Sequence, residues 1–132
     1  MIETADIKEN AALVIKSCQD LVDFEFGFDE RSVAWLADYI EQLKARGFFQ
    51  KDSEGFASIL GCYLGEAIIA TYGGYWHADG KYPLHVVIKG DLKLFPFAKV
   101  HKQMAHGVDA GDSIAGLYRS VPAILTMTRS QP

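Results

Sequence analysis

Glu66 is the residue whose type and position most directly suggest chemistry. It is the only Asp, Glu, Lys or Arg within residues 55–78, so a helix over this stretch would place a carboxylate among apolar side chains. An isolated buried charge is costly, and such a group must be paired or open to solvent. In a functional interpretation Glu66 is a general base or ligand anchor. In a structural one it pairs with Lys99 or Lys102, or accepts a hydrogen bond from the Trp76 indole or a tyrosine.

Four histidines are the other candidate ligands. His77 and His85 flank a predicted hairpin turn, where they could face each other with Asp79 nearby as a two- or three-ligand metal site. His101 and His106 are five residues apart, which places them on different faces of a helix. Solvent-facing strand histidines explain the same pattern, and we therefore predict no metal ion and no cofactor.

The motifs of other common site chemistries are missing from the sequence. There is no Gly-x-Ser-x-Gly nucleophile turn and no glycine-rich phosphate loop, which disfavours serine hydrolysis and nucleotide hydrolysis. Cys18 and Cys62 lie in predicted helices among apolar neighbours, as free buried thiols of a reducing cytoplasm do. The acidic N-terminal residues are unlike a secretory signal. We assign no catalytic residue and keep Glu66 as the weak candidate.

Aromatic residues gather around the predicted first hairpin, which is the most plausible functional surface. Tyr and Trp contribute strongly to binding interfaces. The candidate binding residues for a ligand or partner are Tyr63, Glu66, Tyr75, Trp76, His77 and His85. Tyr72 and Tyr82 belong to the same aromatic group.

Length and charge limit the function classes. The chain has 132 residues, enough for one domain with an ordinary core. Its net charge is −4, but residues 1–30 carry eight acidic side chains against two lysines, and residues 81–106 carry five lysines against one aspartate. No arginine accompanies those lysines, which argues against nucleic-acid binding. We also expect no membrane association, because the apolar stretch contains glycines and a carboxylate.

The periodicity of apolar residues predicts three helices before the hairpin. Apolar residues step by three and four over about residues 5–22, and again from Asp29, a predicted N-cap, to Gly47. A third helix, 54–72, is apolar around most of its circumference and is predicted to be central. Its small residues Ala57, Gly61 and Gly65 are four apart, which we interpret as a place where another backbone comes close.

The pattern changes to alternation after the third helix. Three short strands are predicted over 75–78, 84–88 and 91–95, joined by glycine-containing turns. Pro96 then starts a helix that ends at Gly107. A last short helix, capped by Asp112 or Ser113, is expected to reach Tyr118, before Pro122 interrupts the chain and residues 130–132 fray.

Part of this pattern resembles a group of small uncharacterised bacterial domains of unknown function. The resemblance spans about residues 53–107. It rests on Leu60-Gly61-Cys62-Tyr63-Leu64-Gly65-Glu66, Gly73-Gly74-Tyr75-Trp76, Phe95-Pro96-Phe97-Ala98-Lys99-Val100 and Gly107. It implies a cytoplasmic bacterial protein of α+β shape and brings no activity or cofactor with it.

The sequence therefore predicts one α+β domain over residues 1–132. About three N-terminal helices pack on a small three-stranded antiparallel sheet, followed by one or two short helices. Its parts are an amphipathic helical half (1–52), a central helix with the strands and the following helix (53–107), and a short helix with a tail (108–132). We expect a non-enzymatic module that binds a protein partner, or itself as a homodimer, through the aromatic hairpin. The alternative is a small-molecule or hydrolytic site around Glu66, with no ligand identified.

Overall fold

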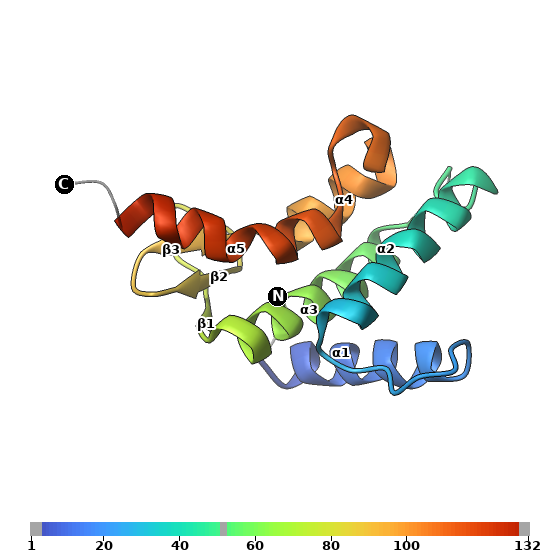
Figure 1. The fold of residues 1–132 in the computed structure, drawn as a ribbon, viewed down its shortest axis with the longest axis horizontal. Coiled ribbons are helices and arrows are strands. Elements are labelled where there is room, and N and C mark those ends of the chain that lie inside the picture. Colours follow the sequence, from blue (N-terminus) through green and yellow to red (C-terminus); the bar gives the residue numbers. More distant parts are fainter. Residues whose placement is uncertain (1–3, 51–52, 130–132) are drawn as a thin grey trace.

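The computed structural model describes residues 4–50 and 53–129, and Figure 1 shows its fold. In chain order the elements are α1 (Thr4–Gln19), α2 (Glu30–Ala45), α3 (Glu54–Tyr72), β1 (Tyr75–His77), β2 (His85–Ile88), β3 (Leu92–Leu94), α4 (Pro96–His106), the 3-10 helix η1 (Val108–Ala110) and α5 (Ile114–Arg129). This is the predicted α+β order of three helices, a meander and further helices.

α3 runs through the middle of the molecule, as its apolar composition predicts (Figure 1). It packs most extensively against α1 and α4, while α2 packs against α5. One core cluster joins residues from all five helices and from β2 and β3, which supports a single domain.

α2 begins where the sequence predicts, because Asp29 caps it. The Asp29 carboxylate accepts a hydrogen bond from the backbone N–H of Ser32 at 2.9 Å. In the connector before it, Phe26 is buried against the Tyr63 ring with centroids 5.7 Å apart. Ser53 occupies the N-cap position of α3 without a side-chain capping bond.

The three strands form an antiparallel meander in the order β1-β2-β3. Trp76 pairs with Val86 across β1 and β2, and Val86 pairs with Leu94 across β2 and β3. All four residues of β2 are buried, including His85 and Val87, which alternate with Val86 and Ile88 along the strand. The middle strand is therefore covered on both sides.

The last helix corrects a prediction. α5 reaches Arg129 and contains Pro122 within it, so 108–132 is not a short helix with a tail. Proline removes the N–H that would bond to the carbonyl of Tyr118 four residues earlier. The Tyr72 hydroxyl donates a hydrogen bond to that carbonyl at 2.8 Å. The freed acceptor is thus satisfied by α3, and the helix continues. The predicted fraying of 130–132 falls outside the described residues.

The Gln103 side chain forms hydrogen bonds that connect three helices in the interior of the molecule. Its side chain is fully buried. Its Nε2 donates to the carbonyl of Ala37 and to Glu41 Oε2, both at 2.9 Å, and its Oε1 accepts from the backbone N–H of Ile114 at 2.9 Å. The buried amide of Gln103 on α4 therefore bonds to both α2 and the start of α5, and its nitrogen and its oxygen both have partners.

Among the described residues, α3 is the one helix long and apolar enough to cross a bilayer. Half of its apolar window is buried inside the molecule. A core helix of a soluble protein has this property, because its apolar surface is covered by neighbouring helices instead of lipid.

Candidate functional site

Glu66 has both carboxylate oxygens engaged. Its Oε2 accepts a hydrogen bond from the Trp76 indole N–H at 3.0 Å, and its Oε1 lies 3.3 Å from the Lys8 ammonium. The indole contact was predicted, but the predicted lysine partners were wrong. Lys99 instead lies 3.5 Å from Asp112. α1, not α4, supplies the cation because α1 packs along the face of α3 that carries Glu66.

The small residues of α3 receive aromatic rings, and the predicted close approach of a backbone was wrong. A Cβ placed at Gly65 would overlap the Trp76 ring carbons Cη2 and Cζ2, and one at Gly61 would overlap the Phe97 ring. The two rings also contact each other, with centroids 5.7 Å apart. The absence of a side chain at Gly61 and Gly65 thus leaves room for these rings, which hold β1 and the start of α4 against α3.

Tyr63 lies apart from the other candidates. Its side chain is fully buried, and its hydroxyl donates a hydrogen bond to the carbonyl of Gly27 at 2.6 Å. Burial raises the pKa of Tyr63 above its ordinary value of 10.0. Tyr63 therefore holds the connector before α2, and the structure does not bring it into a site with Trp76.

Tyr75 joins Glu66 and Trp76 at the surface. Its side chain is 55% exposed. These three residues and Lys8 line a shallow hollow of about 300 Å³ between α1, α3 and β1. The hollow is where a small-molecule site around Glu66 would have to be.

His77 and His85 face each other across the hairpin, as predicted. They are paired residues of β1 and β2, and their ring centroids are 5.6 Å apart. The expectation that both face solvent was wrong for His85, which is fully buried. Its Nδ1 lies 2.6 Å from the carbonyl of Pro83. Because a carbonyl only accepts, Nδ1 carries the proton. Nε2 has no partner among the described residues.

Asp79 organises the hairpin loop. Its Oδ1 accepts hydrogen bonds from the backbone N–H groups of Tyr82 at 2.7 Å and Lys81 at 2.9 Å. These two bonds lower the pKa of Asp79 below its ordinary value. Its Oδ2 lies 3.6 Å from His77 Nε2. Within residues 4–50 and 53–129, no three His, Cys, Asp or Glu side chains are placed to hold a metal ion together.

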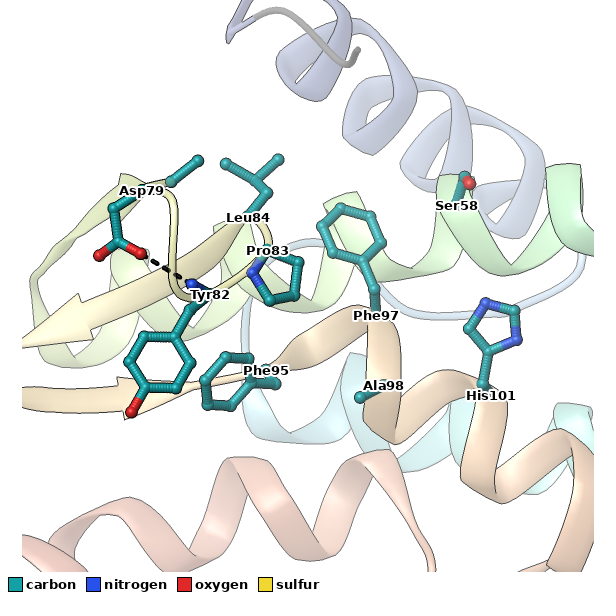
Figure 2. A pocket seen from close by; sticks show the side chains of 10 residues that line it. Ser58, Asp79, Tyr82, Pro83, Leu84, Phe95, Phe97, Ala98 and His101 are labelled. Carbon is teal, nitrogen blue, oxygen red and sulfur yellow. Dashed lines mark hydrogen bonds between the residues drawn. The ribbon is translucent and has the colours of Figure 1, made fainter.

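A second hollow beside these residues is the hairpin pocket, shown in Figure 2. It has a volume of about 470 Å³ and lies between the hairpin loop and the start of α4. Its walls are mainly apolar and aromatic. They are formed by Ser58, Ala78, Asp79, Tyr82, Pro83, Leu84, Phe95, Phe97, Ala98 and His101.

His85 supports two walls of the hairpin pocket from behind. Its ring lies 5.3 Å from that of Phe95 and 5.9 Å from that of Tyr82, centroid to centroid. Tyr82 and Phe95 also contact each other at 5.9 Å. The buried histidine therefore fixes the spacing of the aromatic walls.

The site residues that sequence reasoning missed lie on α4 and at its N-cap, Phe95. Tyr82 belonged to the predicted aromatic group, but Phe95, Phe97 and His101 were not chosen. A signal was present in the sequence, since Gly61 leaves room for a ring on α3, and Phe97 of the Phe95-Pro96-Phe97 run fills it. The sequence alone does not say which ring packs against which glycine, because that depends on the fold.

The fold and the hairpin pocket define a small α+β domain with an aromatic surface pocket. No protein family matches the chain, and no curated protein or solved structure matches it significantly. The resemblance to small bacterial domains of unknown function therefore stays a prediction.

Proposed function

We propose that this protein is a non-enzymatic binding module that holds an apolar side chain of a partner protein in the hairpin pocket. The observation that carries the proposal is the pocket itself. Its volume of about 470 Å³ lies within the usual range of roughly 300–1,000 Å³ for sites that enclose a bound group.

The walls of the hairpin pocket suit an apolar or aromatic guest. Tyr82, Phe95 and Phe97 present rings to it. Rigid aromatic walls give a large contact area with little loss of side-chain freedom. Few polar groups interrupt them, namely Asp79, Ser58 and His101, and these would orient the guest instead of driving its binding.

The charges at the rim favour an acidic partner. The ammonium groups of Lys81 and Lys93 lie 5.4 Å and 5.6 Å from the centre of the Tyr82 ring, and both residues are exposed. The carboxylate of Asp79 is turned toward its own loop by two backbone hydrogen bonds. An acidic segment would therefore meet two lysines against the Asp79 carboxylate on approach, and this excess of positive charge speeds association at low salt.

The contacts of Glu66 support a structural role. Both oxygens of Glu66 have partners on this chain, the Trp76 indole N–H and the Lys8 ammonium, as the oxygens of a structural carboxylate do. We therefore put the binding function at the hairpin pocket ahead of a hydrolytic site at Glu66.

A matched pair of substitutions tests the proposal. Ala98 is exposed at the pocket wall, and Ala123 is exposed on α5. Peptides selected on the wild-type protein from a random display library are synthesised and their dissociation constants measured by calorimetry. We expect Ala98→Phe to weaken their binding at least about tenfold and Ala123→Phe to leave it unchanged. We also expect acidic residues beside an apolar one in the selected peptides.

One result would overturn the hairpin pocket as the binding site, and another would overturn the choice of an acidic partner. Peptides that bind wild type and Ala98→Phe equally well would place the binding surface elsewhere. Binding that does not weaken as salt is added would remove the role of Lys81 and Lys93, because screened surface charges lose their attraction.

We also propose a bacterial cytoplasm as the setting. Cys18 and Cys62 are both free and buried, as thiols in reducing compartments commonly are. The bacterial origin rests on the sequence resemblance alone.

A further inference from the structure

α1 carries a second apolar stripe that the core does not use. Leu13, Ser17 and Leu21 are spaced by four residues, and the two leucines are 49% and 56% exposed. Leu13 and Ser17 lie on α1, about a third of a turn from its core-facing residues at 100° per residue, and Leu21 lies in the turn just after the helix. Those core-facing residues are Ile7, Ala11, Val14 and Cys18.

An apolar groove runs beside this stripe. It has a volume of about 270 Å³, and α2 and α3 form its far wall with Leu36, Tyr39, Phe56 and Ile59. α1 lies along one side of the molecule (Figure 1). Exposed leucines beside an apolar groove form an apolar patch of the kind that marks a protein–protein interaction site.

Leu13 and Leu21 lie four residues before and four residues after Ser17, so the spacing of the stripe is symmetric about Ser17. A two-fold axis through Ser17 of two antiparallel copies of α1 places Leu13 of one copy beside Leu21 of the other. The small serines then face each other on the axis and let the helices come close. A two-fold dimer requires such a self-complementary patch.

The charged residues beside the stripe are also placed so that opposite charges of the two copies meet when the two-fold axis is applied. Lys16 on α1 and Asp20 in the turn after it are exposed, and neither residue lines the groove. The turn stays against the end of the helix, since the Leu21 N–H bonds to the carbonyl of Cys18 at 2.9 Å. The two-fold axis brings Lys16 of each copy next to Asp20 of the other, which gives two opposite-charge pairs at the rim of the contact.

We propose that the α1 stripe is a homodimer interface, and that its occupant is α1 of a second copy of this chain in antiparallel orientation. Each copy inserts Leu13 and Leu21 at the groove of the other. The surface is separate from the hairpin pocket, and either function stands if the other fails.

Cysteine cross-linking tests the position of the axis. In Ser17→Cys the two new thiols meet on the axis, so mild oxidation gives a disulfide-linked dimer within minutes. Ala12→Cys is the control, because Ala12 is exposed on the far side of α1. The native Cys18 and Cys62 are buried, and burial raises the pKa of both thiols, which keeps them out of the reaction. Cross-linking of Ser17→Cys no faster than Ala12→Cys overturns the axis.

A charge swap tests the occupant. Sedimentation velocity over a concentration series gives the dimer dissociation constant. We expect Lys16→Glu and Asp20→Lys each to raise it at least about tenfold, and the double variant to restore it, because two like-charge contacts become opposite-charge contacts again. Circular dichroism confirms that the variants fold. A wild-type protein that stays monomeric, or a double variant as weak as the single ones, overturns the proposal.

Discussion

Glu66 is a carboxylate in a central helix that is stabilised by two different kinds of contact. The Trp76 N–H belongs to a partly buried ring, whereas the Lys8 ammonium belongs to a side chain that is 69% exposed. Exposed ion pairs contribute little to stability, and an indole N–H left without an acceptor costs more. Accepting the hydrogen bond from the Trp76 indole is therefore the main contribution of Glu66 to stability.

This difference predicts how Glu66 responds to substitution. Glu66→Gln keeps an oxygen for the Trp76 N–H, so we expect the free energy of unfolding to fall by about 0.5 kcal/mol. Glu66→Leu removes the acceptor, and we expect a loss of about 1 to 3 kcal/mol. Urea unfolding measures both, with Lys8→Met as the control for the ion pair. Equal losses for Gln and Leu would show that the negative charge itself matters.

Cys18 makes stability depend on alkaline pH. Burial raises the pKa of the Cys18 thiol from 9.0 to about 11, so the native protein keeps the thiol protonated where the unfolded chain ionises. The stabilising contribution is complete below pH 9.0 and is lost as pH rises toward 11. The loss is at most about 2 to 3 kcal/mol. Denaturant unfolding at several pH values checks this, and Cys18→Ala should show a shallower decline. Parallel declines would exclude Cys18 as the cause.

At the scale of elements, α3 and α5 depend on each other. Pro122 frees a carbonyl within α5, and Tyr72 at the end of α3 supplies the donor. The cost of proline inside a helix is thereby reduced, because the carbonyl is not left unsatisfied in a buried contact.

A double-mutant cycle isolates this bond. We expect Tyr72→Phe to lower the free energy of unfolding by about 1 kcal/mol in the wild type. In the Pro122→Ala background residue 122 regains its N–H and can satisfy Tyr118, so Tyr72→Phe should cost close to nothing. The coupling is then about 1 kcal/mol. Identical costs in both backgrounds would mean that the hydroxyl acts elsewhere.

The whole molecule is held together through Gln103, which joins helices far apart in the sequence. It bonds to Ala37 and Glu41 on α2 and to Ile114 at the start of α5. Glu41 in turn accepts a hydrogen bond from the backbone N–H of Val108 at 3.1 Å. One side chain and its partner thus fix the C-terminal part of the chain on α2.

Replacing Gln103 should affect all three helices together. Gln103→Met keeps the volume but strands the Ile114 N–H and Glu41, and we expect a loss of about 2 to 4 kcal/mol in unfolding free energy. Gln42→Met, at an exposed position of α2, serves as the control and should change stability by less than about 0.5 kcal/mol. Similar losses for the two variants would contradict the role of Gln103.

Local signals in the sequence determined the elements of this protein. The Asp29 cap, the apolar circumference of α3 and the turns between the strands act over a few residues, and a single sequence contains them in full. The pairing of His77 with His85 was predicted because the two residues flank the turn of one hairpin, on strands that lie side by side. The end of α5 could not be predicted this way, since the group that satisfies Tyr118 comes from α3.

Only the tertiary structure decided which distant residues meet. Lys8 and Glu66 are 58 positions apart, and Glu41 and Gln103 are 62 apart. Such contacts depend on how helices pack, which is set by the fit of many side chains at once. The same packing seats the rings of Trp76 and Phe97 on the glycines of α3, and it leaves open the hairpin pocket and the groove beside α1.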